Sequence, residues 1–145
     1  MHIVAVIDTN VWVSAFLNPE GFPARLINSG KTGSFSIVAS FPLLEELREV
    51  LLRPRILQLR QTTEAEVETF ITSVAAISQM VPISGELKLC RDPNDDLFLE
   101  TALSGRATHI VSRDEDLTRD LEISKHLEEH GVKVVTVQNF LNLLP

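Results

Sequence analysis

The sequence is poor in cysteine and has no long apolar run. Its 145 residues include a single cysteine, Cys90, which excludes an internal disulfide and a cysteine-rich zinc site and fits a reducing compartment. No segment approaches the roughly 18 apolar residues of a membrane span, and the amino terminus has no basic stretch followed by an apolar core. We therefore expect a cytoplasmic protein without membrane contact, in which Cys90 is a small, part-buried apolar side chain.

Positive charge is also scarce. The chain has 13 Lys and Arg against 20 Asp and Glu, a net charge of -7, which usually argues against nucleic-acid binding because affinity for phosphate comes from Lys and Arg. This total misleads if several carboxylates hold divalent cations, because the cations cancel part of the negative charge. A local basic stretch of Arg48, Arg53, Arg55 and Arg60 is then available for phosphates; its alternative interpretation is a solvated helix end and loop.

Apolar runs rich in β-branched residues alternate with longer segments of helical period. The runs cover residues 3–7, 35–38, 80–83, 109–112 and 132–137. The helical segments cover residues 11–17, 23–29, 42–52, 64–78, 93–104, 124–130 and 137–144, with Thr62 or Thr63 as a cap and 53–61 as a loop. This alternation predicts an α/β fold with a parallel sheet and helices on both faces, in one domain spanning residues 1–145.

Asp8 stands where the first apolar run breaks off. In α/β proteins ligands bind at the carboxyl ends of the strands, so a carboxylate here is a candidate site residue. Asp8, Thr9 and Asn10 are also good helix caps, and a capping role for Asp8 is an equal alternative. Asn10 could cap the helix or hydrogen-bond a metal-binding carboxylate.

Two further acids lie on predicted helices. In the 42–52 helix Glu46 flanks the apolar face whereas Glu45 points away from it; the alternative for Glu46 is a boundary charge paired with Arg53 or another base. In the 93–104 helix Asp95 shares its azimuth with the apolar stripe, and a carboxylate aimed at the core is costly unless it is paired or bound to a cation. Asp96, turned by about 100°, is predicted to be its exposed neighbour.

A last acidic cluster follows the run 109–112. Asp114 is close enough to the predicted strand end to reach Asp8. Asp116 is either a supporting residue or a helix cap, and Ser112 is either an orienting hydroxyl or a structural hydrogen-bond donor.

The order and spacing of these residues resemble the PIN domain family. The likeness rests on the strand running into Asp8-Thr9-Asn10, on Glu46-Leu47, on Asp95 at the start of a Leu- and Ala-rich helix, and on Ser112-Arg113-Asp114. It covers nearly the whole chain. Segments 11–15, 46–54 and 92–96 are more narrowly similar to the branch that contains VapC toxins of toxin–antitoxin systems.

The resemblance implies a three-layer α/β/α sandwich and a Mg²⁺- or Mn²⁺-dependent endoribonuclease acting on RNA. The family's catalytic and metal-binding quartet corresponds here to Asp8, Glu46, Asp95 and Asp114, with Asn10, Ser112 and Asp116 in supporting positions. Many members have Thr in place of Ser112, which keeps the hydroxyl. A homodimer and a cognate antitoxin protein are further implications, and we expect Arg53 and Arg55 to bind RNA.

The chemistry agrees with the resemblance. Clustered carboxylates repel one another, which raises their pKa values, unless a cation holds them, and Mg²⁺ and Mn²⁺ prefer oxygen ligands. Such an ion can position a water, favour its deprotonation and neutralise charge on the scissile phosphate.

Two alternatives belong to other functional classes. One is a catalytically inactive PIN-like module that binds RNA or protein. The other is a phosphotransfer protein with Asp8 as nucleophile, which needs a lysine near the site; Lys88, Lys125 and Lys133 are poorly placed for that role.

Overall fold

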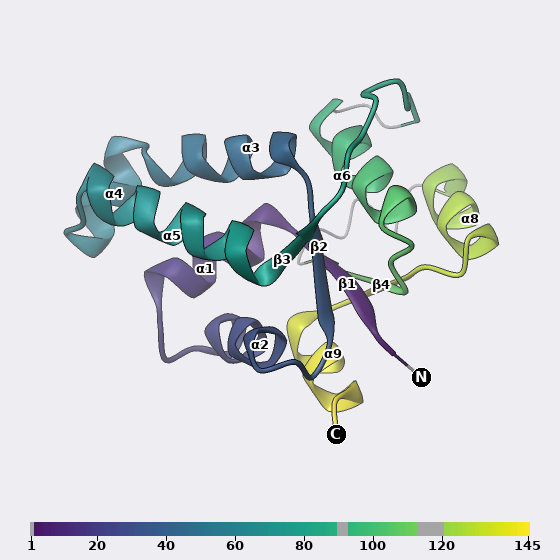
Figure 1. Cartoon of the computed structure of the whole chain (residues 1–145), viewed down its shortest axis with the longest axis horizontal. Helices are drawn as coiled ribbons and strands as arrows, with labels where there is room; N and C mark the ends of the chain where they lie inside the picture. Colours follow the sequence, from purple (N-terminus) through teal and green to yellow (C-terminus); the bar gives the residue numbers. More distant parts are fainter. Residues whose placement is uncertain (1, 90–92, 113–120) are drawn as a thin grey trace.

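A parallel sheet forms the centre of the computed structural model, which describes residues 2–89, 93–112 and 121–145 (Figure 1). The strands are β1 (Val4–Ile7), β2 (Ser36–Ala39), β3 (Ser78–Met80), β4 (His109–Val111) and β5 (Lys133–Val135). Every neighbouring pair is parallel, and the order across the sheet is β3-β2-β1-β4-β5. The predicted parallel sheet is therefore confirmed.

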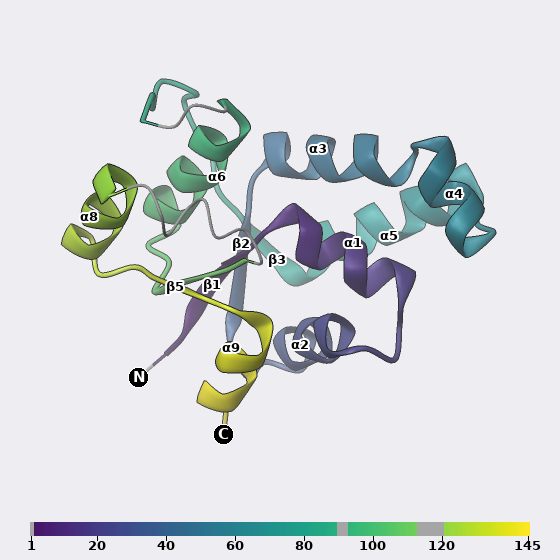
Figure 2. The same cartoon turned by 180° about the vertical axis from the view of Figure 1, so that it is seen from behind.

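Helices connect the strands and cover both faces. They are α1 (Thr9–Leu17), α2 (Phe22–Lys31), α3 (Phe41–Leu51), α4 (Pro54–Arg60), α5 (Glu64–Ile77), α6 (Pro93–Ser104), α8 (Leu121–Glu129) and α9 (Val137–Leu143). Views from the front and from behind both place α6 and α8 on one side of the sheet and α1, α3 and α5 on the other (Figures 1 and 2). The structure has the expected three-layer α/β/α arrangement.

The strands supply both hydrophobic cores because successive side chains point to opposite faces. Ala5 and Ile7 belong to the core beneath α1, α2, α3, α5 and α9. Val6, between them, belongs to the second core with α6 and α8. Strand β1 is thus apolar on both faces, as buried parallel strands are.

Two local predictions were wrong. The third strand is Ser78–Met80 rather than 80–83, because an edge strand that pairs only with β2 can be formed by polar residues without an apolar run. Residues 53–61, predicted as a loop, contain helix α4: Pro54 stands in its first turn, where a missing N–H costs nothing. The predicted cap at Thr63 is confirmed, since its hydroxyl accepts a hydrogen bond from the Glu66 N–H at 3.2 Å.

The carboxyl end of α6 lies very close to β2. A Cβ atom added at Gly105 would lie 2.3 Å from Cγ1 of Val38 on β2 and 3.1 Å from the Thr101 carbonyl oxygen. Only glycine leaves room for this approach, so the sequence here sets the distance between α6 and β2. Within the described ranges of the chain, no helix has the length and apolar character needed to cross a membrane.

Candidate active site

The candidate site lies where the strand order reverses. The chain proceeds from β1 outward through β2 to β3, and then from β4 outward to β5 on the other side. The carboxyl ends of β1 and β4 therefore flank the switch point of the sheet, which is where open α/β sheets bind ligands. Asp8 directly follows β1 and Ser112 directly follows β4.

Asp8 and Ser112 are joined across this switch point. The Asp8 N–H donates to the Val111 carbonyl oxygen at 2.9 Å, and the Ser112 hydroxyl donates to Oδ2 of Asp8 at 2.9 Å. Ser112 is buried and Asp8 is half-buried. The Asp8 side chain makes no capping hydrogen bond to α1, although the residue occupies the N-cap position. Its carboxylate is therefore oriented by β4 rather than used to cap the helix.

A buried pair of hydroxyls links α3 to α6. Oγ of Ser40 lies 2.7 Å from Oγ1 of Thr101, and both residues are fully buried. The Thr101 hydroxyl donates to the Leu97 carbonyl oxygen at 2.7 Å, so Ser40 must be the donor in the bond between the two. Ser40 precedes the first residue of α3, and this bond therefore fixes the start of α3, which carries Glu46, against α6, which carries Asp95.

Sequence reasoning gave Thr101 no role. A threonine inside an apolar helix stripe carries no signal of its own, and its partner Ser40 resembles an ordinary helix cap.

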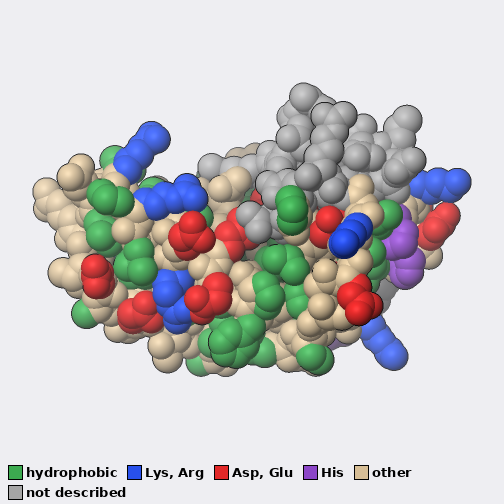
Figure 3. Space-filling model, turned by 90° about the horizontal axis from the view of Figure 1, so that it is seen from above, with side chains coloured by type: hydrophobic (Ala, Val, Ile, Leu, Met, Phe, Trp, Pro, Cys, Tyr) green, Lys and Arg blue, Asp and Glu red, His purple; other side chains and the backbone are tan. Residues whose placement is uncertain are grey.

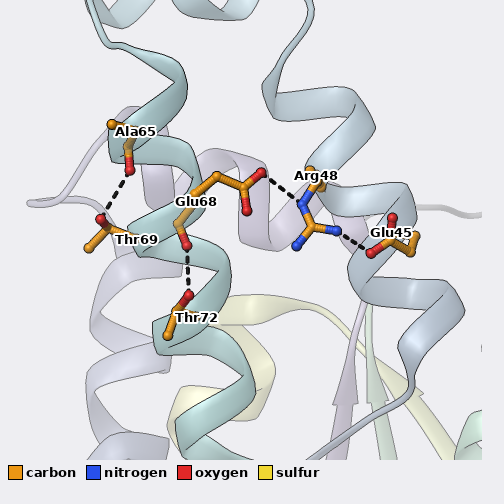
Figure 4. A network of polar contacts seen from close by, with 6 residues as sticks. All are labelled: Glu45, Arg48, Ala65, Glu68, Thr69 and Thr72. Carbon is orange, nitrogen blue, oxygen red and sulfur yellow. Dashed lines mark hydrogen bonds and ion pairs between the residues drawn. The ribbon is translucent and has the colours of Figure 1, made fainter.

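Helix α3 presents its acids in two directions, as predicted. Glu46 is half-buried, whereas Glu45 and Glu49 are exposed. Glu45 forms an ion pair with Arg48, whose Nε also donates to Glu68 on α5 at 2.9 Å (Figure 4). These hydrogen bonds, the one to Glu45 first, raise the pKa of the Arg48 guanidinium. Arg48 therefore links α3 to α5 on the surface. Because its guanidinium is paired with two carboxylates, we no longer count it among the arginines predicted to bind phosphate.

The other arginines of that stretch lie on or beside α4. Arg60 stacks over Phe16, with its guanidinium carbon 4.1 Å from the ring centroid. Arg53 and Arg55 are exposed at the start of the helix.

Helix α6 carries Asp95 half-buried in its first turn. The prediction for its neighbour was wrong: Asp96 is 7% exposed, and its Oδ1 accepts a hydrogen bond from the Leu89 N–H at 2.8 Å. The helical pattern could not reveal the burial of Asp96. The segment that ends near Leu89 packs over this face of α6, which would be exposed to water if the helix stood alone.

Glu100 holds the same segment one turn further along α6. Its carboxylate accepts hydrogen bonds from the N–H and hydroxyl of Ser84, the latter at 3.1 Å, and from the Gly85 N–H at 3.0 Å. Burial raises the pKa of the Glu100 carboxyl, but the hydrogen bonds from Ser84 and Gly85 together outweigh it, so the pKa is lowered. The ionised carboxylate is therefore the form that anchors the segment.

Two of the predicted acids, Asp114 and Asp116, lie outside the described residues, and so does Cys90. Among residues 2–89, 93–112 and 121–145, no three His, Cys, Asp or Glu side chains form a group that could hold a metal ion. Figure 3 looks down on the end of the molecule where α3 and α6 lie and shows acidic and basic side chains interspersed over this face. The predicted quartet thus stays a prediction, with Asp8, Glu46 and Asp95 on three neighbouring elements.

Comparisons with known proteins agree with this architecture. An uncharacterized protein of Methanocaldococcus jannaschii is 28% identical over 143 residues, covering 97% of this chain and 91% of the relative. A chain in the crystal structure of VapBC2 from Rickettsia felis, bound to a DNA fragment from their promoter, superposes with a TM-score of 0.62. The two chains are 15% identical, and the match covers 92% of this chain and 98% of that one, so it shows a shared fold.

The family assignment rests on a direct sequence match. The model of the PIN domain matches residues 4–116, which run from the first residue of β1 past the end of β4. This span contains both sides of the switch point and all the acids predicted for the site. The chain therefore belongs to the PIN domain family.

Proposed function

We propose that the protein is a divalent-metal-dependent ribonuclease that hydrolyses phosphodiester bonds of RNA. The observation that carries the proposal is the Asp8 carboxylate, which lies at the switch point of the sheet in a PIN-family chain and is oriented by the Ser112 hydroxyl at 2.9 Å. Members of this family are typically nucleases, and a fixed carboxylate at this edge is what metal-dependent cleavage requires.

The chemistry of the donor set fits Mg²⁺ or Mn²⁺. The proposed ligands Asp8, Glu46, Asp95 and Asp114 offer only carboxylate oxygens, which these hard cations prefer. Mg²⁺ commonly keeps several waters and needs only one or two direct carboxylates, so some of the four acids can act through water. When bound, the ion supplies an activated water and neutralises charge that develops on the phosphate.

The chain's own groups orient this set. The Ser112 hydroxyl occupies one lone pair of the Asp8 Oδ2 atom and so limits rotation of the carboxylate. The Ser40–Thr101 bond holds the helices that carry Glu46 and Asp95. Asn10 and Asp116 are proposed supporting residues, with Asn10 exposed in the first turn of α1.

RNA contacts require positive charge outside the acidic cluster. We assign this role to Arg53 and Arg55, which are exposed at the start of α4, because exposed guanidinium groups bind phosphate in bidentate geometry.

A partner protein is part of the proposal. The structural likeness to a chain of the VapBC2 complex supports a role as the toxin of a toxin–antitoxin pair, with a cognate antitoxin and a homodimeric assembly. The apolar side chain of Leu143 on α9, which is 51% exposed, is available for such contacts.

The direct test is RNA cleavage by the purified chain with Mn²⁺ or Mg²⁺. We expect shortened products that require the ion, that disappear when EDTA is added and that return when excess Mn²⁺ restores the free metal. Cleavage that persists in EDTA would contradict a metal-dependent mechanism. RNA binding without cleavage at any metal concentration would instead favour the inactive binding module.

A further inference from the structure

Two histidines lie side by side at the end of α8. His126 is in the last turn of the helix and His130 follows its last residue, so the two are one turn apart on the same face. Their ring centroids are 4.7 Å apart, and the ring planes are tilted by 39°. The ribonuclease chemistry proposed above uses neither ring, although imidazole is the commonest metal ligand among protein side chains.

One hydrogen bond determines which nitrogen of His130 carries the proton. Nδ1 of His130 lies 2.9 Å from the carbonyl oxygen of His126, and a carbonyl oxygen can only accept a hydrogen bond. Nδ1 is therefore the donor, and in the neutral ring Nε2 keeps its lone pair. Metal-binding histidines are oriented in the same way, because they donate the other ring N–H to a carbonyl or a carboxylate.

Nε2 of His126 is the second nitrogen available to an ion. It is shielded from water, and among the residues that the structure describes it has no hydrogen-bond partner. Most buried polar side-chain atoms do have a partner, so this unpaired nitrogen requires an explanation, and a bound ion supplies one. His126 as a whole is half-buried and His130 beside it is exposed, so an ion reaches the pair from the surface.

The spacing of the two rings fits a shared ion. Zn²⁺ binds imidazole nitrogen at about 2.0–2.1 Å in tetrahedral geometry, which places two imidazoles on one ion with their ring centres about 5 Å apart. The observed separation of 4.7 Å is close to this value. Packing of one ring on the other also explains the contact, but it leaves Nε2 of His126 without a partner.

The backbone that carries the pair is held in place. Leu127, which follows His126, is 2% exposed in the core that α8 shares with the sheet. Beyond the helix, the Val132 N–H donates to the Leu127 carbonyl oxygen at 2.9 Å. Gly131 has a φ of 72°, the left-handed conformation in which helices commonly end. The two rings therefore stand on a fixed helix end, where the helix dipole favours a cation.

The pair lies toward the opposite edge of the sheet from Asp8. His130 leads within three residues to Lys133, the first residue of β5. Lys133 is aligned, through β4, with Ala5 of β1. Asp8 lies three residues beyond Ala5, about 10 Å further along the strand direction at about 3.3 Å per residue. Figures 1 and 2 also place α8 at the opposite end of the molecule from α4.

We propose that His126 and His130 bind one transition-metal ion of the kind that prefers nitrogen ligands, represented here by Zn²⁺. Imidazole suits Zn²⁺, Cu²⁺ and Ni²⁺, whereas Mg²⁺ is held by oxygen ligands. In the described part of the chain no third His, Cys, Asp or Glu completes the group, and water takes the coordination positions that remain. The bound ion links two successive turns at the end of α8 and stabilises the folded chain.

The test is a calorimetric titration of the protein with Zn²⁺ in the presence of excess Mg²⁺, which competes for carboxylate sites but not for imidazole nitrogen. We expect the unsubstituted protein to bind Zn²⁺. His126→Gln and His130→Gln should each weaken binding by more than about 10-fold, because even residues that merely orient a metal ligand contribute about 10- to 100-fold. The variant that carries both substitutions should bind little worse than either one, since the two rings hold the ion together.

Two substitutions serve as controls. His2→Gln removes a histidine from an exposed position before β1, where Nε2 lies 2.6 Å from the Ser36 hydroxyl, and it should leave Zn²⁺ binding unchanged. Asp95→Asn removes a ligand proposed for the acidic site and should also bind Zn²⁺ normally. Nitrogen NMR spectra of the histidine rings give an independent readout: Zn²⁺ should shift the Nε2 resonances of His126 and His130.

Full affinity for Zn²⁺ in both single variants, with circular dichroism showing that they are folded, would overturn the proposal, because the ion would then be held elsewhere. So would the absence of Zn²⁺ binding by the unsubstituted protein. Loss of binding in Asp95→Asn but not in His130→Gln would assign the ion to the acidic residues instead. The proposal does not rest on the ribonuclease function, so either one can fail while the other stands.

Discussion

Replacing Asp8 with asparagine is expected to lower metal-dependent RNA cleavage by more than about 100-fold. Residues that merely orient a metal ligand typically contribute about 10- to 100-fold, and a direct ligand at the switch point contributes more. Asparagine keeps the volume and can still accept the hydrogen bond from Ser112, so the substitution removes the charge and little else.

The measurement is the rate of cleavage at saturating Mn²⁺, compared with a matched control. Glu49→Gln removes one carboxylate charge from an exposed position of α3, and its rate should stay within about 2-fold of the unsubstituted protein, as for most surface changes. Asp8→Asn with normal activity and the usual dependence on Mn²⁺ would show that this carboxylate does not hold the ion.

Replacing Leu99 with alanine is expected to lower the free energy of unfolding by about 3 kcal/mol. Leu99 is fully buried in the core between α6 and the sheet, one turn after Asp95 on the same side of the helix. Truncation leaves a cavity, because Gly105 and the Ser40–Thr101 bond already hold α6 in close contact with β2 and limit its collapse.

Urea unfolding, monitored by circular dichroism, measures this change. Leu59→Ala is the control, because Leu59 is 64% exposed and its truncation should change the free energy of unfolding by less than about 0.5 kcal/mol. A loss below about 1 kcal/mol for Leu99→Ala would mean that α6 is not anchored through this residue.

The sequence predicted most of the fold because its strong signals are local. Buried parallel strands are apolar on both faces, so β1, β2, β4 and β5 each overlap a visible run of apolar, β-branched residues. The edge strand β3 lacks such a run, and its Ser78 and Gln79 gave no signal. Helix α4 falls in residues 53–61, which were predicted as a loop, although a proline in a first turn, as Pro54 is here, favours a helix start.

The sequence indicates candidate site residues one at a time but not how they are arranged. Strand ends and helix azimuths pointed to Asp8, Glu46 and Asp95, since those signals come from one element at a time. The hydrogen bond from Ser112 to Asp8 depends on β1 and β4 being neighbours, which only the strand order reveals. The burial of Asp96 likewise depends on the segment before α6, which includes Leu89 and packs over the helix. The periodicity of a single helix does not show such a contact.

Mn²⁺ binding, measured by calorimetry on the unsubstituted protein and on Asp95→Asn, tests the central claim most directly, because it needs no choice of RNA. We expect the unsubstituted protein to bind Mn²⁺ and the variant to lose most of the binding heat while its circular dichroism spectrum is unchanged. Unaltered binding by a folded Asp95→Asn, or the absence of binding by the unsubstituted protein, would contradict a metal site built from these carboxylates.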